Sequence, residues 1–115
     1  MDFKDLFGMV LPQGTLDYFE LVSCIQETTR IDLYLEEQSY VPDGFGISDI
    51  ISHGFMREVS IQDFPFRDKS MYLHIKRRRY LIKKTGQTYT RDLNLAFSGT
   101  KITAEFADFL KEVYR

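Results

Sequence analysis

The sequence predicts one α+β domain over residues 1–115, in which a mostly antiparallel sheet with a protruding β-ribbon lies between a short N-terminal helix and a C-terminal amphipathic helix. Its 115 residues are the size of a single domain. Helical spacing of apolar residues is confined to the two ends, and strand-like alternation fills the middle. The expected parts are an N-terminal helical arm over 1–14, a β-rich part over 15–98 and the C-terminal helix over 99–115.

Both helices are predicted from apolar residues that recur at helical intervals. At the N-terminus these residues are Phe3, Leu6, Phe7 and Val10, and a Pro-Gln-Gly sequence at 12–14 stops the helix. Near the C-terminus the spacing i, i+4, i+7, i+8, i+11 indicates one apolar stripe. That stripe consists of Ile102, Phe106, Phe109, Leu110 and Val113.

The first strands are predicted as an antiparallel hairpin. Segments 19–25 and 31–35 are rich in apolar and β-branched residues and flank a polar loop. The single cysteine, Cys24, falls in the first of them and is expected to be a small buried thiol. Residues 40–52 hold Pro, Asp, Ser and two glycines, which favour turns, so they form the main loop.

The second half of the sheet is predicted from three further segments. Residues 53–62 have the pattern of a strand, and residues 63–68 turn the chain. Apolar and polar residues then alternate from residue 71, which is the clearest period-two pattern present. This strand is expected to continue to residue 82, and a turn at 83–87 reverses it into a strand over 88–95.

The formal net charge of −2 hides a strong asymmetry along the chain. Residues 1–66 contain three basic and twelve acidic residues, and residues 92–115 contain three and four. Residues 67–91 contain nine basic residues and one acidic residue. Because a concentrated basic segment attracts a polyanion locally even when the total charge is near zero, this segment predicts a binding surface.

The basic segment is expected to lie on a β-ribbon that extends beyond the packed sheet. In a continuous strand, Lys76, Arg78 and Tyr80 share one face. Arg77 and Arg79 point to the other face, where they would be costly in a core. A two-stranded ribbon of this kind fits a groove of duplex nucleic acid. The candidate DNA-binding residues are Lys76, Arg77, Arg78, Arg79, Tyr80, Lys83, Lys84 and Arg91, with Tyr72 and His74 as supporting contacts.

A plainer interpretation is that these cations pair with the acidic residues of the same chain. Glu36, Glu37 and Glu58 are candidates on neighbouring strands. Cross-strand ion pairs are common and weak, roughly 0.2 to 1 kcal/mol each. The two interpretations differ in whether the guanidinium groups face solvent or carboxylates.

Catalysis, metal binding and membrane insertion are not expected. The chain has two histidines, His53 and His74, and no local signature of an activated serine or cysteine. A single cysteine excludes an internal disulfide and a zinc site built on cysteine pairs, and it suggests a reducing, cytoplasmic location. No segment has the apolar length of a membrane span. No cofactor is expected.

Four segments taken in order resemble the N-terminal region of ISAon-type insertion-sequence transposases of bacteria. They read HGFMREVSIQDFPF at 53–66, MYLHIKRRRY at 71–80, RDLNL at 91–95 and TKITAEFADFL at 100–110. That region is similar to the zinc-ribbon head of DDE transposases, where an H-G-(F/Y) segment, a D-(F/L)-P turn and a basic strand lie between two cysteine pairs. The resemblance covers about residues 11–115.

The resemblance implies a degenerate zinc ribbon that functions in DNA transposition. The two metal knuckles would fall at 41–46 and 81–86, where this chain has no cysteine, so side-chain packing must replace the metal. The implied function is recognition of the ends of the insertion element in double-stranded DNA, without catalysis by this chain. The alternative is a protein interaction module that docks on a separate catalytic polypeptide of the transposase, or on a second copy, through its acidic surface and C-terminal stripe.

Overall fold

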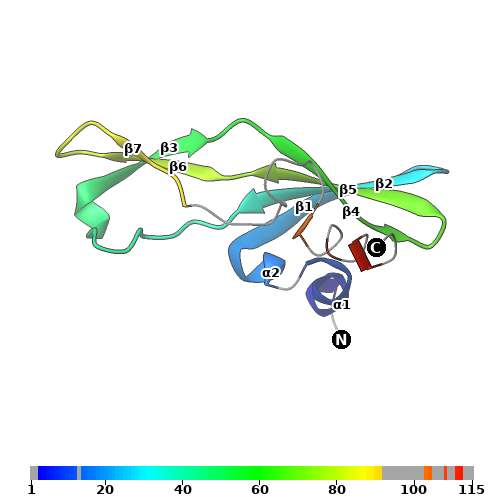
Figure 1. Cartoon of the computed structure of the whole chain (residues 1–115). Helices are drawn as coiled ribbons and strands as arrows, with labels where there is room; N and C mark the ends of the chain where they lie inside the picture. Colours follow the sequence, from blue (N-terminus) through cyan, green and yellow to red (C-terminus); the bar gives the residue numbers. More distant parts are fainter. Residues whose placement is uncertain (1–2, 13, 92–102, 105–107, 109–110, 113–115) are drawn as a thin grey trace.

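A computed structural model of the chain describes residues 3–12, 14–91, 103, 104, 108, 111 and 112. Most of these residues lie in strands, which form two sheets, and helices are few. The two sheets follow one another along the long axis of a molecule that measures 50 × 34 × 23 Å (Figure 1). The predicted α+β class is therefore confirmed.

The larger sheet has four strands in the order β1-β2-β5-β4. β1 (Phe19–Gln26) and β2 (Arg30–Glu37) form the predicted antiparallel hairpin. β2 pairs in parallel with β5 (Lys69–Lys76), and β5 pairs in antiparallel fashion with β4 (Val59–Phe66). Alternate residues of β5 are buried, as its period-two pattern predicts.

One face of this sheet carries the core, against which the N-terminal helices pack. The predicted helix is present as α1 (Phe3–Val10), and a turn at Gly14, with φ of 84°, leads into the short α2 (Thr15–Tyr18). Burial of each large apolar side chain contributes about 1.5 to 3 kcal/mol before the entropy cost of ordering it. The buried core residues are Leu11, Phe19, Leu33, Leu35, Ile61, Met71, Leu73 and Ile75.

The smaller sheet extends away from the core as an elongated projection, on the left of Figure 1. It has the order β3-β6-β7, with β3 (Ile50–Phe55), β6 (Arg78–Ile82) and β7 (Thr88–Tyr89) all antiparallel. A 3-10 turn, η1 (Ile47–Asp49), precedes β3. We call residues 38–58 and 77–91, which contain this sheet, the ribbon.

The predicted turn at 83–87 is confirmed at the end of the ribbon. Gly86 N donates to Ile82 O at 2.8 Å, and Ile82 N donates to Gln87 O at 2.8 Å. Gly86 has a φ of 73°, which only glycine adopts at little cost. The strand expected over 88–95 is formed at Thr88–Tyr89, and residues 92–95 lie outside the described residues.

Two predicted strands are wrong in the same way, because each is divided between the two sheets. The strand expected over 53–62 stops at Phe55, and β4 starts at Val59. The strand expected over 71–82 is interrupted at Arg77. The breaks face each other, since Met56 N donates to Arg77 O at 2.7 Å. The chain therefore passes from one sheet to the other at both places.

Three smaller predictions also need correction or lie beyond the described residues. The turn expected over 63–68 is shorter, because β4 continues to Phe66 and the reversal occurs at Arg67, whose φ is 61°. Cys24 is exposed rather than buried: of the edge strand β1 only Phe19 is buried, and Cys24 lines the cavity between α1 and the sheet. The C-terminal helix expected over 99–115 falls mostly outside the described residues. Of that segment, Thr103 is buried and donates its backbone N–H to Gln62 O at 2.8 Å.

Candidate nucleic-acid interface

A buried carboxylate, Glu37, joins the two sheets at the last residue of β2. Its side chain has 0% exposure. Oε1 accepts a hydrogen bond from Arg78 N at 2.8 Å, and Oε2 accepts from Arg91 Nε at 3.1 Å. The Glu37 carbonyl accepts from Arg78 Nε at 2.8 Å. Two predicted DNA-binding residues are thus held at the start and the end of the basic part of the ribbon by one acidic residue.

Arg91, whose side chain is partly exposed, is held in place by further contacts. Its guanidinium lies 3.9 Å from the centre of the Tyr40 ring and 4.6 Å from that of Tyr18. Its backbone N donates to the Tyr40 hydroxyl at 3.1 Å. Burial is the main cause that raises the pKa of Tyr40, so this phenol stays protonated at neutral pH. Arg91 is committed to Glu37, which corrects the expectation that it faces solvent.

Tyr80 is a core residue of the ribbon and not a surface packer. It is only 3% exposed, its hydroxyl accepts from Tyr40 N at 3.0 Å, and the two rings meet edge to face at 4.9 Å. Phe45 and Tyr89 pack nearby in another edge-to-face pair. The loop before η1 therefore covers one face of the smaller sheet with aromatic rings. Tyr80 is buried, and does not share a surface with Tyr72, because the break at Arg77 places the two residues in different sheets.

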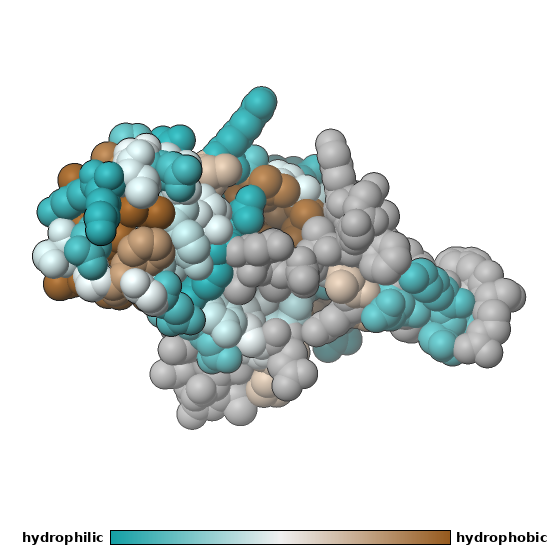
Figure 2. Space-filling view, turned by 60° about the vertical axis from the view of Figure 1, so that its left-hand side comes forward, coloured by the Kyte–Doolittle hydropathy of each residue, from teal (hydrophilic) through white to brown (hydrophobic). Residues whose placement is uncertain are grey.

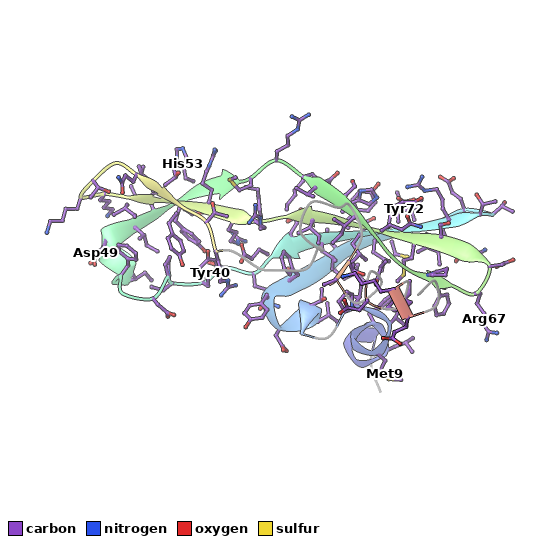
Figure 3. The ribbon with its side chains drawn as sticks, viewed as in Figure 1. Met9, Tyr40, Asp49, His53, Arg67 and Tyr72 are labelled. Carbon is purple, nitrogen blue, oxygen red and sulfur yellow. The ribbon has the colours of Figure 1, made fainter. Side chains whose placement is uncertain are left out.

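Tyr72 and His74 lie in the larger sheet, on the face opposite its core. Figure 3 shows Tyr72 far from Tyr40 and Asp49 of the ribbon. His74 Nε2 lies 2.6 Å from Asp32 Oδ1, and its Nδ1 lies 2.7 Å from Ser60 Oγ. The structure therefore does not bring these two residues together with the cations of the ribbon.

The hydrogen bonds around His74 tie three strands together. A hydrogen bond from Arg30 is the main cause that lowers the pKa of Asp32, so the carboxylate is ionised and accepts from His74 Nε2–H. His74 Nδ1 and the Ser60 hydroxyl form the second hydrogen bond of the ring. The Tyr34 ring stacks on His74 at 4.5 Å. Ser60, His74 and Asp32 thus follow one another in the order of a hydrolase's nucleophile, base and carboxylate. They lie on one face of the larger sheet, whereas the apolar cavity beside α1 opens on the other face and does not adjoin them.

The opposite face of the ribbon's sheet is open and bordered by cations. Ile51 and Leu81 are paired across strands at its centre, and Ile51 is exposed. Arg79 lies on β6 two residues before Leu81, and Arg79 Nε donates to His53 O at 3.1 Å. Lys83 follows β6 as the first residue of the turn. This face therefore presents an apolar centre with the Arg79 cation beside it.

Five cations of the ribbon remain available to a ligand, and we call them the ribbon cations. Within the described ranges, none of them forms an ion pair with a carboxylate. Lys83 and Lys84 are exposed at the turn, and Arg77 and Arg79 are half-buried. The set is Arg57, Arg77, Arg79, Lys83 and Lys84. Lys76, half-buried at the end of β5, lies opposite Glu36 of β2 at the junction instead.

Sequence reasoning missed Arg57, which is exposed in the link between β3 and β4. Its neighbour Met56 is hydrogen-bonded to Arg77 O, so Arg57 lies beside the basic run. In the sequence this arginine belongs to the acidic segment 1–66, and averaging over that segment conceals it. Only the antiparallel pairing of β3 with β6 brings it to the ribbon cations.

Comparison of the chain with protein-family models, curated proteins and solved structures found no match. In the described part of the chain, no three His, Cys, Asp or Glu side chains are grouped so that they can hold a metal ion. The helices described there are too short or too polar to cross a membrane. The geometry of the ribbon is therefore what bears on function.

Proposed function

We propose that this chain binds double-stranded DNA through the ribbon. The observation that carries the proposal is the separation of charge between the sheets. Residues 77–91 contain six basic residues and no acidic one, and only Arg78 and Arg91 of these are engaged with Glu37. The remaining cations stand on a projection that a duplex can approach without meeting the acidic sheet.

The narrower role that we propose is recognition of the ends of an insertion element, in partnership with a separate catalytic polypeptide. The support for this role is the resemblance of segments 53–66, 71–80, 91–95 and 100–110 to the transposase region. The sheet of the ribbon has three strands, whereas the β-ribbons that enter a DNA groove have two, so the contact proposed here is that of its cations with the phosphates. This chain supplies binding in the proposal, and catalysis belongs to the other polypeptide.

Lysines at the turn provide the cleanest test, because their side chains make no described contact that holds the fold. A variant with Lys83→Gln and Lys84→Gln should bind a fluorescent duplex more weakly than the wild type. Each lost phosphate contact should lower the slope of log affinity against log salt by roughly 0.9. Anisotropy titrations at several salt concentrations, on random and element-end duplexes, measure both quantities.

Arg67→Gln is the matched control for the lysine variant. Arg67 is exposed at the turn between β4 and β5, at the far end of the molecule from the ribbon (Figure 3). It should leave affinity and slope unchanged. A loss in Arg67→Gln about half as large as that of the lysine variant, which removes two charges, would indicate a nonspecific effect of net charge. No binding by the wild type at low salt would refute the proposed function.

A second candidate function is self-association through the apolar surface beside α1. Leu6 and Met9 of α1 and Phe66 of β4 are exposed there. A cavity of about 280 Å³ lies between α1 and the sheet and is lined by Phe7 and Met71 among others. Apolar surface of this kind is typical of protein contact sites. Sedimentation over a range of concentrations tests it, and a Leu6→Ser, Met9→Ser variant should remain monomeric if the wild type dimerises.

A further inference from the structure

The most exposed large apolar side chain measured in the described residues lies at the end of the ribbon. Ile47, the first residue of η1, is 80% exposed. In Figure 2 the ribbon comes forward on the left, and brown hydrophobic residues stand there among teal hydrophilic ones. Isolated exposed apolar residues are common, so the exposure of Ile47 does not by itself indicate a binding site. What distinguishes Ile47 is the way its turn is held.

The turn that carries Ile47 is closed by hydrogen bonds at both ends. Gly46 N donates to Asp49 Oδ2 at 2.8 Å, and Asp49 N donates to Gly46 O at 3.0 Å. A Cβ at residue 46 would lie only 3.1 Å from the Asp49 carboxylate oxygen, so glycine lets this turn close. Phe45, directly before it, is anchored against Tyr89. Ile47 therefore lies on a turn that hydrogen bonds and an aromatic contact hold closed.

The same turn is tied to the cationic end of the ribbon. Lys83 N donates to Asp49 O at 3.0 Å, which joins η1 to the beginning of the turn that holds Lys83 and Lys84. The Asp49 carboxylate accepts a hydrogen bond from the Gly46 N–H and keeps its negative charge. An exposed apolar side chain on a hydrogen-bonded turn is thus joined through Asp49 to the segment of the two exposed lysines. Such an arrangement loses little conformational entropy when it binds.

We infer that Ile47 is a wedge that inserts between base pairs of a duplex held by the ribbon cations. This inference rests on the proposed function and specifies how the DNA is bound. Proteins that grip the minor groove with cations often insert an apolar side chain between two base steps, which unstacks them and bends the duplex. Lysines on the phosphates and a fixed isoleucine at the tip are the parts that this mode of binding needs.

A mismatched base pair provides the test, because unstacking it costs less than unstacking a perfect pair. The wild type should bind a short duplex with one central mismatch about tenfold more tightly than the fully paired duplex, a factor that corresponds to ~1.4 kcal/mol. Ile47→Ser should bind both duplexes equally and keep the salt slope of the wild type. Ile47→Met, which retains a long apolar side chain, should keep the preference.

Ile25→Ser is the matched control, since Ile25 is 46% exposed on β1 of the larger sheet, outside the ribbon. It should keep the preference for mismatched DNA. Binding without any preference, or a preference that survives in Ile47→Ser, would overturn the wedge and leave DNA binding intact. Absence of binding to both duplexes by the wild type would refute the proposed function itself. A fluorescent base analogue beside the mismatch should brighten only with variants that retain the wedge.

Discussion

Arg91 and Glu37 form a 3.0 Å ion pair across 54 residues of sequence, and this pair fastens the ribbon to the larger sheet. Glu37 is wholly buried, and Arg91 is the cation that compensates its charge. Arg78 completes the junction through its backbone N–H and its guanidinium. The position of the ribbon relative to the core therefore depends on this small group of charged residues.

Arg91→Ala should be one of the most destabilising single substitutions in the chain. It leaves the Glu37 carboxylate buried with only the Arg78 N–H, and an uncompensated buried charge costs on the order of 3 kcal/mol. Urea denaturation followed by circular dichroism measures the loss. Arg91→Lys keeps the positive charge but lacks the planar guanidinium with its several N–H donors, and it should lose less stability than Arg91→Ala. Glu20→Gln, on the exposed edge strand β1, serves as the control and should leave the free energy of unfolding nearly unchanged.

Acid should weaken the larger sheet through Asp32. The hydrogen bond from Arg30 is the main cause that lowers the pKa of this carboxyl below its ordinary value of 3.8. A carboxyl whose pKa is lower in the folded state stabilises the fold above its unfolded pKa, and that contribution disappears as the pH falls through the folded pKa. The free energy of unfolding should therefore decline below about pH 4.

Asp32→Asn isolates this carboxyl from the other acidic groups. The asparagine variant should be less stable than the wild type at neutral pH, and the difference between them should shrink as the solution is acidified. Denaturant titrations at several pH values measure both curves. A constant difference at every pH would show that the Asp32 charge contributes nothing to the acid sensitivity.

A negative charge near the end of the ribbon should oppose DNA binding. Asp43 is exposed in the loop that leads to η1, and in the described residues it forms no ion pair. Asp43→Asn should strengthen binding by about twofold, the effect of one charge roughly 10 Å from a phosphate in water. The gain should vanish at high salt, where charges at this distance are screened. A gain that persists there would argue for a direct contact instead.

Local patterns in the sequence predicted the elements but not how they are divided between sheets. Alternation of residues 71–75 predicted β5, because each apolar side chain there is buried by its own strand's pleat. Nothing in the residues around Arg77 marks the break that sends β6 into the second sheet. The parallel pairing of β2 with β5 also depends on contacts between distant segments.

The same limit applies to the candidate interface. The excess of cations at 67–91 predicted a basic ribbon, and charge density is a property that sequence shows directly. Which cations are free depends on where Glu37 lies, and that position follows from the pairing of β2 in the folded chain. Sequence reasoning therefore grouped Arg78, Tyr80 and Arg91 with residues that face solvent. It also left out Arg57, which only strand pairing brings near.

The central claim is that the arginines of the junction with Glu37 are separate from the ribbon cations that contact DNA. Arg78 belongs to the junction and its neighbour Arg79 to the ribbon cations, so comparing their substitutions is the most direct measurement. Salt titrations of duplex binding should be run on Arg78→Ala and Arg79→Ala in parallel. We expect Arg79→Ala to lower the log-log slope by roughly 0.9 with little loss of stability. Arg78→Ala should lower stability and leave the slope as in the wild type. Equal slopes for both variants, whether reduced or unchanged, would contradict the assignment of these residues.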